Sequence, residues 1–346
     1  MWFNEQITNN LTIKEIIVNF MPSWWYKNYG ISYGRDMIFN SDYRINADRE
    51  MRKVFYERFG RFCNSGSSDP KERIVFPDWD NTYYQTMLGF DTQYPADQYP
   101  CAGGQLTDDE AMALKVPENF WDVYPFNEQA RQIKEMSRRF NRDIPLWVRT
   151  RGILNEGVQI CGSDFYGELL DEDCDEKTAH VFSFILGVIE QQLLSNKKCN
   201  AEASHIMMNC TAAVAGARTY SAHVLDYDRA IYNFCVENGI GIGLHHCGRF
   251  DDFVNVYSVF RELYFIEIGH TSKIRPVLEA YPNADIQYIV DTKFMYNSTV
   301  PSVREFCGEI KEQIRGHENR FHLSIPDLDA GTPDDNIMTV IEEFQK

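Results

Sequence analysis

Short apolar segments alternate with longer segments of helical periodicity along most of the chain, and this alternation restricts the folds open to it. Apolar segments of strand length follow one another in the second half of the chain, at 205–211, 240–246, 264–269, 286–291 and 320–326. Strands that are almost continuously apolar are typical of parallel sheets, because helices cover both faces of such sheets. The pattern therefore predicts an α/β fold with a parallel sheet.

Earlier apolar segments at 73–77 and 144–150 extend the series, and we expect one further strand between residues 152 and 164. Helical patterns separate the strands, at 127–139, 176–194, 226–237, 251–262, 273–280, 303–314 and 333–344. An open doubly wound sheet is the alternative. The glycine-rich segment 239–243, however, lies within a strand and opens no helix, unlike a phosphate-binding loop. A (β/α)8 barrel of the TIM type is therefore the better prediction.

The first part of the chain has a different pattern. Residues 1–72 are rich in aromatic side chains and mostly helical in periodicity, and 46–62 is the clearest amphipathic segment. Serine, glycine and proline in segment 64–70 end that helix. The sequence thus predicts a helical N-terminal extension over 1–72, followed by a catalytic barrel domain over 73–346.

Acidic residues outnumber basic ones, with 51 Asp and Glu against 34 Lys and Arg, and the formal net charge is -17. This charge disfavours nucleic acid and anionic membranes as partners. No apolar run approaches the roughly 18 residues of a membrane-spanning helix, and the start of the chain lacks the pattern of a secretory signal. The nine cysteines are irregularly spaced, unlike a disulfide framework. We therefore expect a cytoplasmic protein whose cysteines are packed thiols or metal ligands.

Barrels of this type carry their chemistry at the carboxyl ends of the strands. Polar and metal-binding residue types are concentrated at those ends in this sequence. The residues concerned are Asp78, Asp80, Arg149, Arg151, Asn209, Cys210, His245, His246, Cys247, Glu267, His270, Asp291, Asp327 and Asp329. We expect the active site to be built from this set.

One strand ends in the sequence Leu-His-His-Cys-Gly, at residues 244–248. Residues two apart in a strand point to the same face, so His245 and Cys247 project together and His246 projects the opposite way. An imidazole and a thiolate on one face form half of a zinc site, since Zn(II) binds nitrogen and sulfur ligands tetrahedrally. The alternative is a buried cysteine beside a hydrogen-bonded histidine.

Two motifs carry a resemblance to a known family. The segment His-His-Cys-Gly-Arg-Phe at 245–250 resembles the metal-binding element of the zinc-dependent methylcobamide:coenzyme M methyltransferases. The segment Gly-Thr-Pro-Asp-Asp-Asn at 331–336 resembles a signature that follows the last strand in the uroporphyrinogen decarboxylase superfamily. The likeness covers roughly residues 45 to 345. It implies a barrel fold, a zinc ion and a corrinoid as methyl carrier.

The sequence also departs from that family. The family's third zinc ligand is a cysteine shortly before the Gly-Thr-Pro element, and Pro326 occupies the matching position here. We therefore expect His245 and Cys247 to be joined by further ligands from Glu267, His270, Asp327 and Asp329. The segment after the first expected strand (76–84) contains carboxylates and aromatics but no arginine. Decarboxylation of a polyanionic porphyrinogen is therefore disfavoured.

Other residues at or after the strand ends are expected to act in catalysis or substrate binding. Asp80 and Glu267 are candidate catalytic groups, which would supply or remove a proton at the reacting heteroatom. Aromatic residues after the first strand are either a lid over an apolar substrate or ordinary anchors of a surface loop. The predicted substrate-binding residues are Asp78, Trp79, Tyr83, Tyr84, Arg149, Asn209 and Asp291.

These observations favour a zinc-dependent methyltransferase that moves a methyl group between a small substrate and a corrinoid (cobalamin) protein. The corrinoid is expected on a separate partner, because the sequence lacks the Asp-x-His-x-x-Gly element of cobalamin-binding proteins. Two alternatives remain open. One is a metal-independent decarboxylase or lyase of the same fold, and the other is a corrinoid-binding accessory protein.

Overall fold

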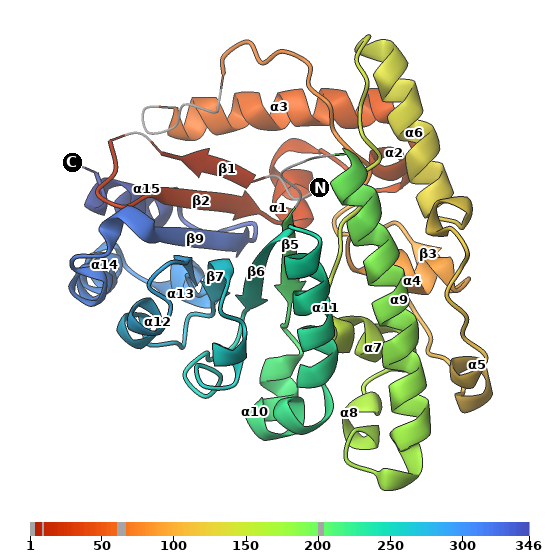
Figure 1. Ribbon diagram of the computed structural model, residues 1–346. Coiled ribbons are helices and arrows are strands. Elements are labelled where there is room, and N and C mark those ends of the chain that lie inside the picture. The colour runs from red at the N-terminus through yellow and green to blue at the C-terminus, as the bar shows by residue number, and fades with distance from the viewer. Residues whose placement is uncertain (1–3, 9, 61–66, 200–203, 346) are drawn as a thin grey trace. The chain divides into compact units, whose positions relative to one another are not determined.

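The computed structural model describes residues 4–8, 10–60, 67–199 and 204–345 (Figure 1). The chain forms two compact units. The first comprises Met1–Trp79, Tyr94–Pro100 and Glu267–Lys346, and the second comprises Asp80–Gln93 and Cys101–Ile266. Each unit therefore contains segments that are far apart in the sequence.

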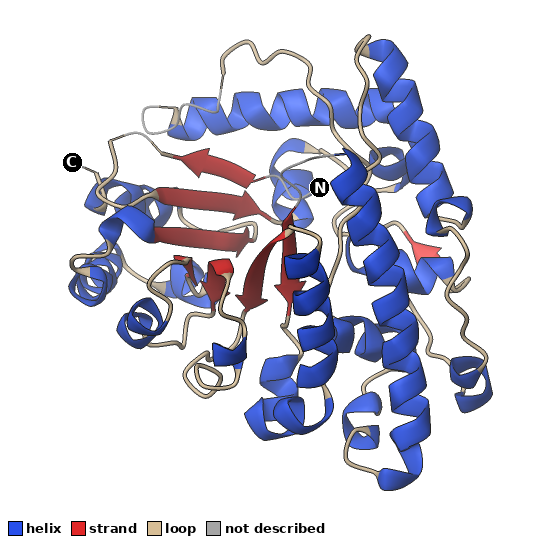
Figure 2. Cartoon of the chain, viewed as in Figure 1, coloured by secondary structure: helices blue, strands red, loops and turns tan. Residues whose placement is uncertain are grey.

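The first unit contains sheet strands in the order β1-β2-β9-β8, and strands are drawn in red in Figure 2. Its strands are β1 (Asn4–Ile7), β2 (Glu15–Phe20), β8 (Asp285–Ile289) and β9 (Phe321–Leu328). Strand β2 pairs in parallel with β9, and β8 pairs in parallel with β9, whereas β1 is antiparallel to β2. The first five residues of β9 are all buried, as expected for a strand covered on both faces.

The helices of the first unit are α1 (Pro22–Tyr29), α2 (Arg35–Phe39), α3 (Ser41–Phe59), α12 (Ile274–Ala280), α13 (Thr292–Asn297), α14 (Val300–Ile314) and α15 (Asp334–Glu343). Their ends follow local sequence signals. Helix α1 has a proline in its first turn and ends at Gly30, which has a φ of 67°, a conformation that favours glycine. The side chain of Asn40 caps α3 by accepting a hydrogen bond from the backbone N–H of Tyr43.

An aromatic cluster joins helices α1 and α3 to strand β2. The ring of Phe20, the last residue of β2, lies 4.1 Å from that of Trp24 and 5.7 Å from that of Trp25, measured between centroids. Phe59 of α3 stacks on Phe20 at 6.0 Å. All four side chains are almost completely buried. Large aromatic rings contribute much of the burial energy in such a core, so this cluster fixes α3 alongside the sheet (Figure 1).

The second unit contains strands β5 (Ser204–Met208) and β6 (Gly241–His246), together with most of β7 (Leu263–Ile268), in the order β7-β6-β5. Strands β5 and β6 are parallel. A short antiparallel ribbon joins β3 (Thr92–Gln93) to β4 (Cys101–Ala102). The helices are α4 (Tyr83–Met87), α5 (Asp108–Met112), α6 (Phe126–Arg139), α7 (Ile153–Cys161), α8 (Phe165–Glu168), α9 (Asp175–Cys199), α10 (Ala212–His223) and α11 (Leu225–Glu237).

Helix α9 is the longest element, with 25 residues. It begins with Asp175 and Glu176 and ends with Lys197 and Lys198, charges that complement the helix dipole. It packs against α5, α7 and α11. Within the described residues, no helix is both long enough and apolar enough to cross a membrane.

The prediction of an α/β fold with parallel strands is confirmed. Strands β5 to β9 lie where the last apolar segments predicted them, and β1 and β2 were not predicted. Helices α6, α9, α11, α12, α14 and α15 match predicted helices, whereas 251–262 forms turns and a short 3-10 helix at Tyr257–Val259. Residues 61–62 and 64–66 of the predicted helix and linker lie outside the described residues. The closed eight-stranded barrel and the boundary at residue 72 stay predictions.

Two predicted strands are wrong, for a common physical reason. Segments 73–77 and 144–150 are not strands, and side chains bind several of their backbone groups instead. The amide of Asn196 bonds both the N–H and the carbonyl of Val148, at 3.0 and 2.8 Å, and Arg44 Nε donates to the carbonyl of Val75 at 2.8 Å. Buried backbone groups require partners, but these need not be another strand. The strand expected between 152 and 164 is replaced by helix α7.

A glycine substitution tests how closely α7 approaches β5. A Cβ atom at Gly152 would lie 2.2 Å from the carbonyl oxygen of Met208, the last residue of β5. Because that neighbour is backbone, we expect Gly152→Ala to lower the free energy of unfolding by about 1–3 kcal/mol in urea denaturation. Gly167→Ala is the matched control, since a Cβ there meets nothing within 4 Å. An equal effect of the two substitutions would contradict the close approach.

Candidate metal centre

The pairing of strands β5 and β6 aligns the residues that follow them. Met208 lies opposite His245 in the parallel register, so Cys210 and Cys247, each two residues further along, fall opposite one another. The backbone N–H of Asn209 donates to the carbonyl of His245 at 2.8 Å, which extends the alignment beyond the strand. The side chains of alternate residues share a face, and this register therefore gathers three metal-binding side chains at one strand edge.

Cys210, His245 and Cys247 form a compact group. One ligand atom from each, two thiol sulfurs and one imidazole nitrogen, lies within 4.8 Å of the others. The Nε2 atom of His245 is 3.0 Å from the Sγ atom of Cys210. Cys210 and His245 are half-buried, and Cys247 is exposed. This group can hold a metal ion.

The residues flanking Cys210 are held by buried hydrogen bonds. Asn209 Nδ2 donates to Asp228 at 2.7 Å and to the Tyr220 hydroxyl at 3.1 Å, and that hydroxyl also donates to Asp228. On the other side, the N–H and hydroxyl of Thr211 donate to Asn155 Oδ1 at 3.1 and 2.5 Å. Two neighbouring backbone positions are thus fixed, which restrains the thiol between them before any ion arrives.

The Cys210 thiol is easily deprotonated, and the deprotonated form is the one that a metal ligand needs. A hydrogen bond with Cys247 holds the pKa of the Cys210 thiol well below its usual value, in opposition to burial, and His245 and Asn155 act in the same direction. The thiolate is the form that binds metal ions. Deprotonation therefore costs little at this position at neutral pH.

His246, between the two ligands from β6, points the opposite way. Its side chain is fully buried, and its Nδ1 atom lies 3.1 Å from the Tyr257 hydroxyl. Rings of Phe250 and Phe253 pack on it. Burial lowers the pKa of His246 to about 4, so the ring is neutral near pH 7 and belongs to the packed interior.

A second polar cluster lies at the start of α7. Arg149 pairs with Asp80 at 3.2 Å, and Arg151 Nε lies 3.4 Å from Glu156 Oε1. Arg151 also donates to Asn81. Glu156 is 1% exposed. Burial raises its pKa to about 7, although Arg151 and Arg149 oppose this effect.

The predicted aromatic residues are located in the interior. Trp79 is fully buried, and its indole N–H donates to the Tyr94 hydroxyl at 3.2 Å. The Tyr83 hydroxyl donates to Gln129 at 3.1 Å, and Tyr84 is 2% exposed. These contacts are typical of packing anchors, the alternative considered for the lid, and a role in substrate binding stays a prediction.

Other predicted site residues belong to the first unit. Glu267 accepts a hydrogen bond from Gln287 at 2.5 Å, Asp291 caps α13, and Asp329 accepts from Ser23 at 2.5 Å. His270 and Asp327 lie in the same unit. Among the described residues, the metal-binding group contains none of these. The assignment of His270, Asp327 and Asp329 as ligands therefore stays a prediction, as do the roles of Asp78, Asn209 and the candidate catalytic pair.

Cys210 is the member of the group that the sequence analysis did not assign as a ligand. It was recognised at a strand end, but nothing in its local sequence resembles the zinc motif. A signal was nevertheless present. Parallel strands of similar length end together, so the second residue after β5 and the second residue after His245 are expected to be neighbours.

Comparison with known proteins finds a likeness in structure but none in sequence. The sequence matches no protein-family model and no curated protein. Among solved structures, a methyltransferase from Methanosarcina mazei is similar, with a TM-score of 0.63 and 11% sequence identity. The match covers 98% of this chain and 93% of that chain. At this identity the likeness concerns the fold alone.

The pKa of Glu156 gives a prediction of stability against pH. Its pKa rises from 4.5 to about 7 on folding, so the folded chain binds the extra proton and the free energy of unfolding falls as pH increases from 4.5 through 7. The total fall from this group is at most about 3 kcal/mol. When the free energy of unfolding is measured by urea denaturation at pH 5 to 8, Glu156→Gln should lack this part of the fall with pH. If the free energy of unfolding changed with pH in the same way for the variant and the unmodified chain, the prediction would be contradicted.

Proposed function

We propose that this protein is a zinc-dependent methyltransferase that transfers a methyl group between a small substrate and a corrinoid protein. The Cys210–His245–Cys247 group carries the proposal, because it offers a metal-binding ligand set at the carboxyl ends of two parallel strands. The resemblance of residues 245–250 to the corrinoid-linked methyltransferases supports it. So does the similar fold of a methyltransferase. We also propose that the sheet closes as a (β/α)8 barrel.

The ligand set fits zinc. Two thiolates and one imidazole are common ligands of this ion, and three protein ligands leave the fourth tetrahedral position for a substrate or water, as in catalytic sites. A bound zinc ion would act as a Lewis acid toward the heteroatom that gives or receives the methyl group. Cys210, His245 and Cys247 would hold it.

The two sulfur ligands also bear on the substrate. The sequence predicted His245 and Cys247 with one or two further ligands from Glu267, His270, Asp327 and Asp329, a harder set that favours an oxygen substrate. The observed group contains two thiols, and this softer set favours a sulfur ligand in the fourth position. We therefore propose a small thiol as the methyl acceptor, ahead of an alcohol or an aryl ether.

The chain's own residues would prepare this site. Asn155 accepts a hydrogen bond from the backbone N–H of Thr211, and the side chain of Asn209 donates to Asp228, so Cys210 would need little rearrangement on binding. Asp80 and Glu267 remain the proposed groups that take or return the substrate's proton. Asp80 pairs with Arg149 at 3.2 Å, and this contact would hold its side chain in place.

The proposed reaction needs a corrinoid-carrying partner and a compartment that keeps thiols reduced. We propose that the corrinoid is carried by a separate protein, as the family resemblance implies. A site built from two thiols needs a reducing compartment to remain intact, and we therefore place the protein in the cytoplasm.

Substitution of the three ligands tests the proposal. We expect Cys210→Ala, Cys247→Ala and His245→Ala each to reduce zinc, measured by elemental analysis, from near one per chain to below about a tenth of that. Methyl transfer from free methylcob(III)alamin to a small thiol should fall by roughly 100-fold or more. The folded structure should persist in circular dichroism, because the ligands lie at a strand edge rather than in the core.

Cys101→Ala is the matched control, since Cys101 is an exposed thiol of the same unit and is not part of the group. It should retain zinc and activity. Near-stoichiometric zinc in Cys210→Ala would contradict the assignment of that ligand. Full methyl transfer by zinc-free protein would contradict the proposed chemistry.

A further inference from the structure

The first unit contains a cavity of about 350 Å³ between helices α2 and α3 and the segment 73–78. This volume is within the range of small-molecule sites. Much of the wall is apolar or aromatic, including Tyr33, Met37, Met51, Phe76 and Tyr99. Tyr33 is held by a hydrogen bond from its hydroxyl to the sulfur of Met51, at 3.8 Å. Flat rings and thioethers of this kind suit a planar apolar ligand.

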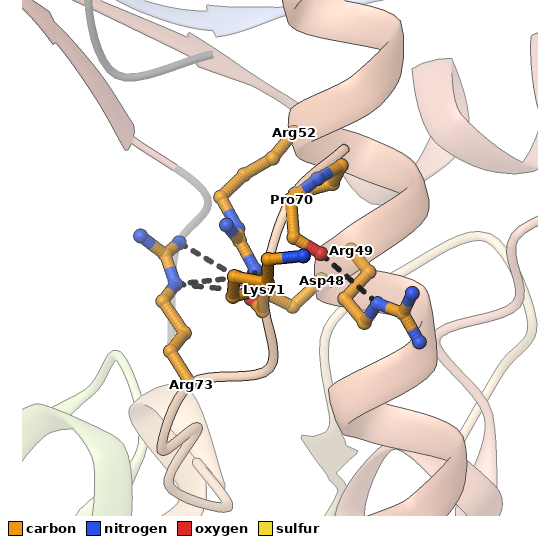
Figure 3. A network of polar contacts seen from close by, with 6 residues as sticks. All are labelled: Asp48, Arg49, Arg52, Pro70, Lys71 and Arg73. Carbon is orange, nitrogen blue, oxygen red and sulfur yellow. Dashed lines mark hydrogen bonds and ion pairs between the residues drawn. The ribbon is translucent and has the colours of Figure 1, made fainter. Parts of the chain in front are cut away.

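Charged residues occupy another part of the wall, which is formed by Arg44, Asp48, Arg73 and Asp78. Asp48 lies between two arginines (Figure 3). Arg73 binds it in a bidentate manner, with Nη2 at 2.7 Å from Oδ1 and Nε at 3.0 Å from the same oxygen and 3.1 Å from Oδ2. Arg52 Nε donates to Oδ2 at 2.9 Å.

The arrangement leaves an excess of positive charge. Arg52, Asp48 and Arg73 together carry one net positive charge, and both oxygens of Asp48 already accept arginine N–H groups. A cationic ligand would therefore compete with two arginines for one carboxylate. Arg44, which is 2% exposed, adds a further positive charge, and its guanidinium donates to the backbone carbonyls of Met37, Ile38 and Val75. The wall also contains a second carboxylate, Asp78, so Arg44, Arg52 and Arg73 together exceed Asp48 and Asp78 by one positive charge.

The two arginines that bind Asp48 are not equivalent. The side chain of Arg52 is 8% exposed, whereas that of Arg73 is 47% exposed. Arg52 is further fixed by donating to the carbonyl of Lys71 at 2.5 Å. Arg73 can thus turn toward a ligand while Asp48 keeps its buried partner, so the exchange leaves no buried carboxylate unpaired. The planar guanidinium matches the geometry of a carboxylate or sulfonate.

We propose that this cavity binds a small molecule with a single aromatic ring and one anionic group, a carboxylate or sulfonate. The ring lies among the tyrosines and methionines, and the anion pairs with Arg73. The proposal does not depend on the proposed methyl transfer, because it uses residues of the first unit alone.

Three compounds with the same ring test the class of ligand: benzoate, neutral benzamide and cationic benzylammonium. Binding is measured by calorimetric titration of the full-length protein. We expect benzoate to bind at least about tenfold more tightly than benzamide, which is the effect of one charge-assisted arginine contact. Benzylammonium should bind more weakly than either. Equal affinity for the three, or tighter binding of benzylammonium, would overturn the proposal.

Variants test the location. Arg73→Gln should reduce the affinity for benzoate to that for benzamide, with little loss of stability because Asp48 retains Arg52. Met37→Trp should fill the cavity and abolish binding of both compounds. Arg49→Gln is the matched control, since Arg49 follows Asp48 on α3 but donates to the carbonyl of Pro70 at 3.2 Å (Figure 3) and is not part of the wall. Unchanged benzoate binding by Arg73→Gln, or by a folded Met37→Trp, would overturn the proposed site.

Discussion

The parallel pairing of β5 with β6 is the interaction on which the metal-binding group depends. Its register sets Met208 opposite His245 and so brings Cys210 to Cys247. A slip of one residue would turn each side chain to the other face, which would bury the ligands and expose His246. Close packing also restrains the end of β5, since Gly152 approaches the carbonyl of Met208 where no side chain fits. The geometry of the site is thus a consequence of strand pairing and of backbone contact.

Buried polar side chains perform a second structural task in this protein. Arg44 and Asn196 bind the backbone of segments that have no strand partner. Beside Cys210, Asn155 accepts a hydrogen bond from the backbone N–H of Thr211, and the side chain of Asn209 donates to Asp228. Such groups are retained in an interior only when their hydrogen bonds are made. In this protein they position loops that regular secondary structure does not reach. Arg44 also forms part of the wall of the cavity in the first unit.

The chain is acidic overall, but its charged residues are unevenly distributed. Around Asp48, arginines outnumber the carboxylate that they share, whereas around Glu156 two arginines and two carboxylates lie together. Burial then decides the protonation of Glu156, since desolvation outweighs the nearby positive charges. At the metal-binding group the balance is reversed, and hydrogen bonds favour the charged thiolate of Cys210.

The sequence by itself determined the α/β class, the later strands and the shared face of His245 and Cys247, because these follow from the periodicity of nearby residues. It did not determine which apolar segments become strands. Segment 144–150 has the composition of a strand, yet its backbone is satisfied by Asn196, a residue of the distant helix α9. Nor did it identify Cys210 as the partner of His245, 35 positions away. Only the tertiary structure decided these features, because they depend on contacts between residues whose separation along the chain leaves no local pattern.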